Sequence, residues 1–505
     1  MTGQLPRRAV LGFGAAVAFQ DLTKPPKQTR AATKPSRPAL ARLAIREEPV
    51  GRTLPSGLCG LSLETAVLTA PGVLDPRNHE LIELHKGISR NGLLRLGGNT
   101  SDVSWWQGRP DGSQPAMRHS PTTLSRRFFA LQPERVRALR GFVDETGWRV
   151  IWGLNFGTGT PEQAAEEAAA VHAILGPALL AFQIGNEPDL FNRYGHAMRG
   201  ADWSSSRYVD EWTSFARSVL TVCPQARFWG PDTAINDDWI TRFALEAPKR
   251  LGAHITGLSG HYYAEGPPDA PESTIEHLLA GDPRVERRLA DLQAVLPATG
   301  LPFVMTEGNS CYLGGKPGVS DSFASALWGA DYVARMASGG CDGVCFHGGA
   351  AEVEHANGEN SQGAHTAAEH VRAKSGAFYS PIAGTPETGY TARPLYYGLQ
   401  AAASLANTSL LPCALETGGA NLTAYAGRHD AEITLLLVNR DLQNDVRLDI
   451  ACSGGPRRIM SDRQLIASSV HALNGVHFRD MPALAGQAPS GLAVPRASIL
   501  LLTLR

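Results

Sequence analysis

The sequence predicts an α/β protein in which a (β/α)8 barrel, the TIM barrel, is followed by a C-terminal β-sandwich. Short β-rich runs alternate with helical stretches eight times over roughly 340 residues, which is the pattern of that barrel. After residue 406 the chain reads as strands and turns only, which is typical of a sandwich. No Gly-x-Gly-x-x-Gly turn follows a strand, which argues against the rival fold, a doubly wound sheet.

The length and composition fit this division. A chain of 505 residues is too long for one ordinary domain, but it fits one large barrel with a smaller companion. Hydrophobic residues make up 43% and charged residues 19%, which is a globular composition. A formal net charge of −1 gives no global field for nucleic acid or an acidic membrane surface. No apolar run reaches the roughly 18 residues that a membrane span needs. We therefore expect neither nucleic acid as a partner nor an integral membrane segment.

Residues 1–20 are typical of an export signal. Arg7 and Arg8 precede the apolar stretch Ala9–Phe19, and the paired arginines resemble a twin-arginine leader. Residues 21–46 are rich in basic residues and proline, which predicts a linker rather than a folded segment. We therefore expect an exported protein, periplasmic or secreted. A disordered cytoplasmic tail is the alternative interpretation.

Eight β-rich runs make up the predicted barrel, which is assigned to residues 47–405. In chain order they are Gly57–Glu64, Gly92–Gly97, Arg149–Phe156, Ala181–Glu187, Arg227–Asp232, Ile255–Tyr262, Pro302–Glu307 and Asp342–His347. Polar residues end almost every one of these runs, a pattern that stability alone does not require.

Amphipathic stretches between the strands predict the helices of the barrel. Clear examples are Pro133–Thr146, Pro161–Leu175 and Ser322–Ser338. The second has a strong start, because Thr160 offers a capping hydroxyl, a proline follows it, and Gln163 is placed to bond back. Gly176 marks its end.

The C-terminal part, residues 406–505, predicts a small sandwich. Its most strongly β segments are Ala431–Asn439, Val446–Ala451 and Ser498–Leu504. Residues 40–56 could contribute a further strand to it.

We predict no metal and no organic cofactor. Seven cysteines, an odd and sparse number, do not make a disulfide framework, and Cys341 and Cys345 are expected to be buried thiols. The chain has no His-Glu-x-x-His, no paired Cys-x-x-Cys motifs and no phosphate-binding glycine loop.

Two glutamates at predicted strand ends are the candidate catalytic pair. Glu187 leaves the fourth strand within Asn-Glu-Pro, and Glu307 ends the seventh. Strands four and seven lie across the barrel mouth from each other, where such barrels carry their chemistry. Glycoside hydrolysis uses two carboxyl groups, about 5–5.5 Å apart for retention and about 6.5–9.5 Å for inversion. Two surface glutamates are the alternative. Further polar strand ends are Asp232, His261 and His347.

The chain resembles glycoside hydrolase family 79, the family of heparanase and bacterial β-glucuronidases, over residues 57–405. The matching segments are Leu94–Ser101, Gly153–Thr160, Gln183–Asp189, Thr306-Glu307 with Ser320–Phe323, and Ala392–Gly398. Five separated motifs in order make the resemblance specific.

This resemblance implies a role for each catalytic candidate. Glu187 would be the acid/base, and Glu307 would be the nucleophile that forms a glycosyl-enzyme ester. Asn186 would bond the sugar 2-hydroxyl. Tyr263 would hold the nucleophile ionised, with Tyr262 as the alternative inward-facing tyrosine.

The resemblance also implies that the loop after the nucleophile binds the C6 carboxylate of a uronic acid. In the family a tyrosine hydroxyl and backbone N–H groups do this, and the matching residues are Tyr312 and Gly314. Leu313 departs from the extra glycine of heparanase, which leaves the specific donor open, and a simple glycine turn is the alternative. The other expected substrate-binding residues are Glu64, Asn99 and Tyr379.

The predicted function is exo-acting hydrolysis of terminal β-linked glucuronic acid by a retaining β-glucuronidase, acting as a monomer. The substrate would be a glucuronide or a glycosaminoglycan-type oligosaccharide. The stretch Gln107–Phe129 is long enough to wall off one end of a cleft, which favours exo action. A heparanase-like endo-β-glucuronidase is the alternative, and the residues that could seat a sulfated chain are Arg118, Arg126, Arg127 and Arg193. Further alternatives are a relative that acts on a neutral glycoside and a barrel that binds carbohydrate without catalysis, and the presence of both glutamates argues against the latter.

Overall fold

The computed structural model describes residues 38–48, 53–108, 112–118, 127–193, 198–349, 363–481 and 484–505. The expected export signal and most of the expected linker lie outside these residues. Residues 38–505 make up one unit of the chain. Among the helices in the described ranges, none combines the length and the apolar character that a membrane crossing needs.

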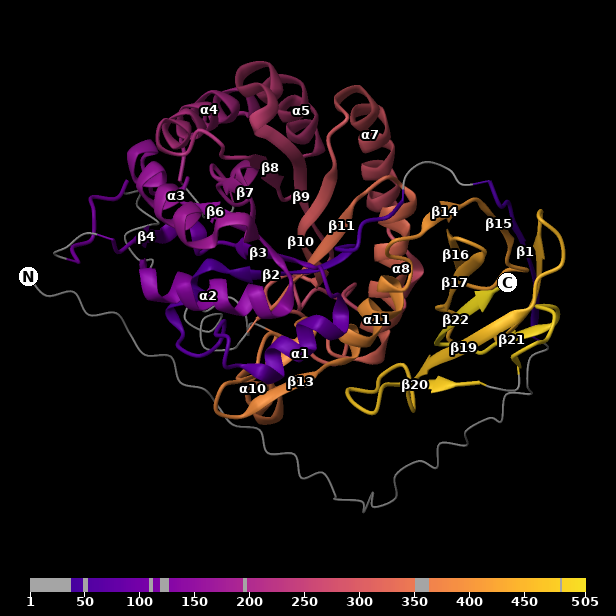
Figure 1. Cartoon of the computed structure of the whole chain (residues 1–505). Helices are drawn as coiled ribbons and strands as arrows, with labels where there is room; N and C mark the ends of the chain where they lie inside the picture. Colours follow the sequence, from indigo (N-terminus) through magenta and orange to yellow (C-terminus); the bar gives the residue numbers. More distant parts are fainter. Residues whose placement is uncertain are drawn as a thin grey trace, which may run out of the picture. The chain divides into compact units, whose positions relative to one another are not determined.

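Eight parallel strands close into a barrel, which confirms the predicted fold class (Figure 1). Their order around the barrel is β10-β11-β2-β3-β6-β7-β8-β9. Their bounds are β2 Cys59–Glu64, β3 Leu93–Gly97, β6 Arg149–Leu154, β7 Leu179–Ile184, β8 Phe228–Thr233, β9 Ile255–Glu265, β10 Phe303–Cys311 and β11 Gly343–His347. Each predicted run contains or overlaps one of these strands.

Helices surround the barrel on the outside (Figure 1). Their bounds are α1 His79–Ile88, α2 Pro133–Thr146, α3 Pro161–Leu175, α4 Ser205–Val222, α5 Asp237–Leu251, α6 Ile275–Ala280, α7 Pro283–Thr299, α8 Phe323–Ser338, α10 Ala367–Ala373 and α11 Pro394–Ala403. Helix α3 starts as its sequence predicts, because the Gln163 N–H donates to the Thr160 hydroxyl at 3.3 Å and the Thr160 N–H donates to the Gln163 side chain at 3.0 Å. Two short sheets pair β4 Ser104–Trp106 with β5 Phe129–Leu131, and β12 Ile382–Thr385 with β13 Gly389–Ala392.

The interior of the barrel is layered. The layer farther from the candidate active site is a buried apolar cluster, separate from the main core. Its members are Leu93, Ile151, Ala181, Trp229, Val304 and Cys345. Two residues further along, four of these strands carry a polar side chain on that face, namely Arg95, Gln183, Thr306 and His347. Along the strands, an apolar layer is therefore followed by a polar layer, and the candidate active site follows the polar layer.

The C-terminal part consists of two sheets that share an apolar core. The six-stranded sheet has the order β14-β16-β17-β22-β19-β20, and the four-stranded sheet has the order β15-β1-β18-β21. Their bounds are β1 Ala39–Ile45, β14 Ser409–Leu411, β15 Cys413–Glu416, β16 Leu422–His429, β17 Glu432–Asn439, β18 Val446–Cys452, β19 Ile459–Ile466, β20 His477–Asp480, β21 Leu492–Val494 and β22 Ser498–Leu504.

Strand β1 corrects the expected extent of the N-terminal linker. Residues 39–45 are not a linker, because they pair antiparallel with β15 and parallel with β18. Ala41, Leu43 and Ile45 alternate with more exposed neighbours and enter the sandwich core. This alternation supplies the apolar face that a strand needs, and β1 overlaps the range 40–56 from which a further sandwich strand was expected.

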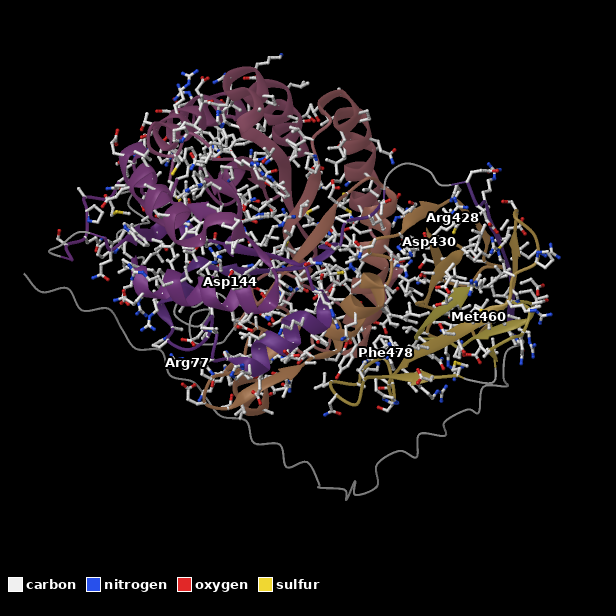
Figure 2. The ribbon with its side chains drawn as sticks, in the orientation of Figure 1. Arg77, Asp144, Arg428, Asp430, Met460 and Phe478 are labelled. Atoms are coloured by element: carbon white, nitrogen blue, oxygen red, sulfur yellow. The ribbon has the colours of Figure 1, made fainter. Side chains whose placement is uncertain are left out.

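A buried carboxylate on the barrel joins the two parts of the unit. Asp331 on α8 accepts hydrogen bonds from the hydroxyls of Thr423 at 2.6 Å and Tyr425 at 2.8 Å, and it pairs with Arg440 at 3.0 Å. Side chains fill the space between strands and helices, while exposed charges such as Arg77 lie on the periphery (Figure 2).

Candidate active site

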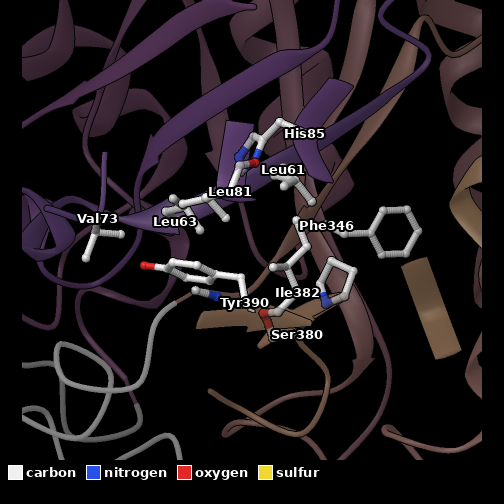
Figure 3. A pocket seen from close by; sticks show the side chains of 12 residues that line it. Leu61, Leu63, Val73, Leu81, His85, Phe346, Ser380, Ile382 and Tyr390 are labelled. Atoms are coloured by element: carbon white, nitrogen blue, oxygen red, sulfur yellow. Dashed lines mark hydrogen bonds between the residues drawn. The ribbon is translucent and has the colours of Figure 1, made fainter. Parts of the chain in front are cut away.

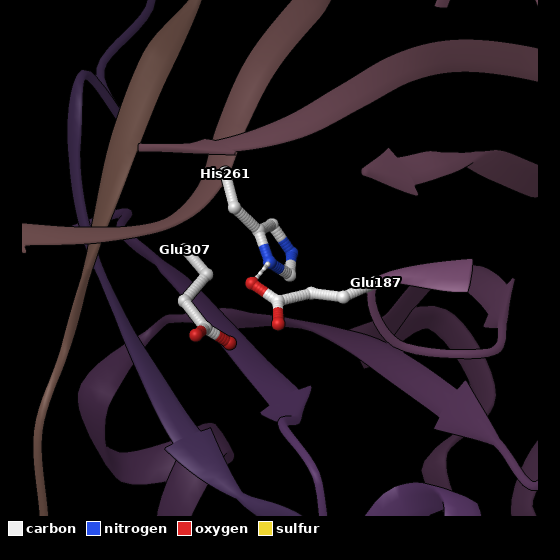
Figure 4. Close-up of side chains that lie close together, drawn as sticks. All are labelled: Glu187, His261 and Glu307. Atoms are coloured by element: carbon white, nitrogen blue, oxygen red, sulfur yellow. Dashed lines mark hydrogen bonds and ion pairs between the residues drawn. The ribbon is translucent and has the colours of Figure 1, made fainter. Parts of the chain in front are cut away.

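Two strands bring the candidate catalytic glutamates together. Glu187 follows β7 and precedes the short 3-10 helix Pro188–Leu190, whereas Glu307 lies within β10. A carboxylate oxygen of each and a ring nitrogen of His261 all lie within 4.8 Å of one another. Figure 4 shows the two carboxylates beside each other, with the imidazole next to Glu187.

The surroundings of Glu307 favour its ionised form. Arg95 donates to one carboxylate oxygen at 2.6 Å, and the Tyr263 hydroxyl donates to the other at 2.9 Å. A ring nitrogen of His347 lies 3.5 Å from the carboxylate. Burial by itself raises the pKa of this carboxyl, but the neighbouring charges of His347, His261 and Arg95 lower it to about 2. Glu307 is therefore a carboxylate at neutral pH, as a nucleophile must be.

Glu187 is shifted in the opposite direction. Burial raises its pKa, a hydrogen bond from His261 opposes that effect, and the negative charge of Glu307 adds to it. The raised pKa favours the protonated acid. Two carboxyl groups whose pKa values are pushed apart by their environments are the arrangement that separates an acid from a nucleophile.

The polar layer beneath the pair is organised by Arg95. Its guanidinium, buried inside the barrel, donates to Asp232 at 2.5 Å, to the Gln183 side chain at 3.1 Å and to the Asn186 side chain at 2.8 Å. The guanidinium also donates to Glu307, as described above. One cation thus orients the carboxylate of Glu307 and the side-chain amide of Asn186, because its planar donors point in fixed directions.

His261 links Glu187 to the polar layer. Its Nδ1 lies 3.0 Å from Glu187, and its Nε2 lies 3.1 Å from Asp232. Burial by itself lowers the pKa of the imidazole, but the charges of Asp232 and Glu307 raise it to about 10. The ring therefore carries protons on both nitrogens, and each proton points at a carboxylate.

The protonation of His261 affects whether this site could bind a metal ion. Glu187, His261 and Glu307 are close enough together to share an ion, yet an imidazole that is protonated on both nitrogens has no lone pair to offer. We interpret the three residues as a proton-holding network, and independence from metal stays a prediction.

The backbone at Glu187 is held in an unfavourable conformation. Its φ of 49° lies in the left-handed region, which costs a residue with a side chain roughly 1–2 kcal/mol. The buried carboxylate of Asp102 accepts hydrogen bonds from the N–H groups of Asn186 at 3.1 Å, Gly157 at 2.8 Å and Phe156 at 3.2 Å. Burial raises the pKa of Asp102 to about 7 although these bonds lower it. The surrounding bonds therefore support the strained turn that presents Glu187.

Glu64 and Asn99 lie in the same network. One oxygen of Glu64 accepts from the N–H of Thr100 at 2.8 Å and from its hydroxyl at 2.5 Å, and the other accepts from the N–H of Asn99 at 3.3 Å. His347 lies between Glu64, at 3.7 Å, and Glu307. The Asn99 side chain in turn accepts from Asn186 at 3.3 Å.

Three predicted tyrosines gather beside Glu307. The ring of Tyr263 lies 6.3 Å from that of Tyr312 and 6.2 Å from that of Tyr379, between centroids. Tyr262 faces the other way, because its hydroxyl donates to Asp282 at 2.7 Å. The inward tyrosine is therefore Tyr263.

The loop after Glu307 has an unusual backbone. Leu313, Gly314 and Gly315 have φ values of 58°, 85° and 86° in succession. The Gly314 carbonyl accepts from the Phe378 N–H at 2.7 Å, which fastens this loop to the segment that carries Tyr379. All nine predicted site residues thus lie around one centre.

Arg95 and Asp102 are the site residues that the sequence analysis did not identify. Arg95 interrupts an apolar run, and a charge in a strand that is buried on both faces is a signal that could have found it. For Asp232, His261 and His347 the sequence indicates a strand-end position, but the pairing among them depends on the closed barrel.

A small cavity lies away from the candidate catalytic pair, beside β2, β11 and β12 (Figure 3). Its volume is about 30 Å³, which is room for about one water molecule, and its lining is mostly apolar, with Leu61, Leu63, Leu81 and Ile382. A sugar does not fit there.

The comparisons with known proteins point to glycosidases. No family model matches the chain. A β-glucuronidase of Neurospora crassa is 27% identical over 401 residues, which are 70% of this chain and 65% of the relative. A β-glucuronidase of Aspergillus niger is 25% identical over 269 residues, which are 48% of each chain. The chain thus spans less than two thirds of the length of either relative. These identities do not establish membership of family 79.

Solved structures share the fold over nearly the whole chain. A GH51 arabinofuranosidase from Xanthomonas axonopodis pv. citri has a TM-score of 0.67 at 18% identity, covering 92% of this chain and 100% of its own. A 4-O-α-L-rhamnosyl-β-D-glucuronidase from Fusarium oxysporum has a TM-score of 0.63 at 16% identity, covering 91% and 100%. At these identities the likeness concerns the fold alone.

Proposed function

We propose that the protein is a glycoside hydrolase, and specifically a retaining β-glucuronidase that removes terminal glucuronic acid. One observation carries the proposal. A carboxylate oxygen of Glu187 lies within 4.8 Å of one of Glu307, and the pKa of Glu187 is raised while the pKa of Glu307 is lowered. A separation of about 5–5.5 Å between the two carboxyl groups is the spacing of retaining enzymes. The β-glucuronidase relatives support the same substrate class.

The reaction takes two displacements. In the first, a Glu307 oxygen bonds to the anomeric carbon while the bond to the leaving oxygen breaks, and Glu187 gives its proton to that oxygen. In the second, Glu187 takes a proton from water, the water oxygen bonds to the anomeric carbon, and Glu307 leaves as a carboxylate. Glu187 recovers its proton in this step, so the enzyme returns to its starting state.

The uronic acid is recognised at the C6 carboxylate in this proposal. Tyr312 and the backbone of Gly314 are the donors, and the ring of Tyr312 lies 6.3 Å from that of Tyr263, which contacts the nucleophile. Asn186, held by Arg95, is placed to bond the 2-hydroxyl. Charge-assisted hydrogen bonds to a carboxylate are worth about 1.5–3 kcal/mol each, and a glucoside offers only a neutral hydroxyl at that position.

The proposal also includes that the enzyme cleaves at the chain end (exo action) and that the protein is exported. Nearly half of the expected wall over 107–129, residues 109–111 and 119–126, lies outside the described part of the chain. Arg118, a candidate for seating a sulfated chain, pairs with Glu211 at 2.5 Å, which favours small substrates over a polyanion. Cell fractionation would test export.

Hydrolysis of a chromogenic β-glucuronide, beside the matching β-glucoside and β-xyloside, tests the function. We expect turnover of the glucuronide by far the fastest, with the β-anomer of glucuronic acid as the first product in an NMR time course. Comparable rates on the three glycosides would refute the preference for glucuronides. An α-anomer formed first would refute the retaining mechanism. Mid-chain cleavage of heparan sulfate without release of glucuronic acid from small substrates would move the assignment to an endo enzyme.

A further inference from the structure

The loop between β8 and α5 is fastened to the segment of the acid/base. The fully buried carboxylate of Asp189, two residues after Glu187, accepts the N–H groups of residues 234–236 at 2.9, 3.1 and 3.1 Å. The Asn236 side chain adds a bond at 2.8 Å. The Glu187 N–H donates to the Asp232 carbonyl at 3.0 Å, so the two segments are joined at two places.

This fastened loop holds a large aliphatic side chain in solvent. Ile235 is 54% exposed although its own N–H is bonded to Asp189. The path through Asp189 keeps the Cα atoms of Ile235 and Glu187 within about 15 Å of each other. Behind them, the Trp203 indole donates to the Pro188 carbonyl at 2.8 Å, and this ring packs 6.4 Å from the ring of Trp239. The segment beyond Glu187 is therefore fixed by hydrogen bonds, and Ile235 is a large apolar side chain that it exposes.

The barrel order shows which part of a substrate would reach this side. Of the groups proposed to hold the glucuronic acid, Glu64 on β2 and Asn99 after β3 lie across the ring from β8, whereas Tyr263 on β9, beside β8, contacts the nucleophile. Strand β8 lies opposite β2 around the ring. Glu187 protonates the leaving oxygen between the two sides, so a group beyond it belongs to the aglycone.

We infer that Ile235 contacts the aglycone and that the preferred substrates are β-glucuronides of apolar aryl or alkyl alcohols. The inference rests on the proposed function and narrows its substrate class. Arg193, which is exposed and follows the 3-10 helix after Glu187, represents the competing possibility of an anionic sugar as aglycone.

The test compares two substrates that share the glucuronic acid. Naphthyl β-glucuronide carries an apolar aglycone, whereas β-glucuronyl fluoride has none. In Ile235→Asn, the kcat/KM ratio of naphthyl glucuronide to fluoride should fall about three- to tenfold, mainly through KM on the aryl substrate. In the matched control Ile235→Leu, the ratio should stay within about twofold of the wild-type ratio, since the apolar contact is kept.

Several outcomes would overturn the inference. A ratio that does not change in Ile235→Asn, or equal losses on both substrates, would show that Ile235 does not contact the aglycone. A sulfated disaccharide glucuronide that is preferred over the naphthyl substrate, with the preference lost in Arg193→Gln, would assign this side to an anionic sugar. If the wild type hydrolyses neither substrate, the proposed function itself fails, which is a different result from an unchanged ratio in an active enzyme.

Discussion

Two adjacent tyrosines allow a matched test of the surroundings of Glu307, the proposed nucleophile. Tyr263 donates to Glu307 at 2.9 Å, so Tyr263→Phe removes one hydrogen bond to a charged oxygen and keeps the ring. Tyr262 points out of the barrel, where its hydroxyl donates to Asp282 and its ring stacks 4.9 Å from that of Tyr332. Tyr262→Phe therefore changes the same group on the other face of the same strand and serves as the control.

The size of the effect follows from the lost bond. A hydrogen bond to a charged group is worth about 1.5–3 kcal/mol, which corresponds to roughly one to two pKa units. The pKa of Glu307 should rise by that amount from about 2, and Arg95 would still keep the carboxyl ionised at neutral pH. A carboxyl with a lowered pKa is ionised above that pKa, so activity is lost as pH falls through it. The acid limb of the pH–rate profile should therefore move upward by roughly one to two pH units.

The loss of rate should fall on the second displacement. Negative charge returns to Glu307 when its ester bond breaks, so the missing donor slows this step by up to roughly 10- to 150-fold. With dinitrophenyl β-glucuronide, which needs little acid assistance, Tyr263→Phe should show a burst of phenolate followed by slow turnover. An acid limb and steady-state rate like those of the wild type, or an equal loss in Tyr262→Phe, would refute the assignment of Tyr263.

Further predictions concern the catalytic pair, metals, the uronate loop and stability. Glu307→Gln should lose nearly all turnover while staying folded by circular dichroism, and full activity in this variant would exclude Glu307 as the nucleophile. Azide should partly rescue Glu187→Ala on an activated substrate, because azide needs no general base. Dialysis against EDTA should leave the rate unchanged, and a loss that zinc or calcium restores would contradict the proton-network interpretation. Tyr312→Phe should lower glucuronide turnover more than any residual glucoside turnover, and equal losses would argue against a contact with the C6 carboxylate. Asp331→Ala should lower the free energy of unfolding in urea by roughly 3–5 kcal/mol, because Arg440 is left buried without its anion; a change below about 1 kcal/mol would show that the pair contributes little.

Local chemistry accounts for the parts of the fold that the sequence could predict. Helix α3 is defined by its capping residues, and the barrel strands are defined by short runs that end in polar residues. Glu187 and Glu307 were identifiable because chemistry in a barrel is confined to one end of its strands. None of these inferences needs a contact between distant residues.

The remaining features depend on contacts between distant residues. Arg95 and Asp232 are 137 positions apart, and nothing in either segment indicates that they pair. His261 looks like one more polar strand end until both of its nitrogens are seen to face carboxylates. The partners of strand β1 could not be predicted for a related reason, because they lie more than 360 positions further along the chain, as with Arg42 opposite Glu416.

That long-range pairing makes the barrel an insertion between strands of a single sandwich. The N–H of Leu54, before the barrel, bonds the carbonyl of Thr408, after it, so the two ends of the barrel are adjacent. During synthesis, β1 emerges early but gains its neighbour β18 only after about 400 more residues, which takes about 20–80 s at ordinary elongation rates. Throughout that interval its unpaired edges are open to other chains or to a chaperone. The barrel can fold while it waits, so the order of assembly would be barrel first and sandwich last.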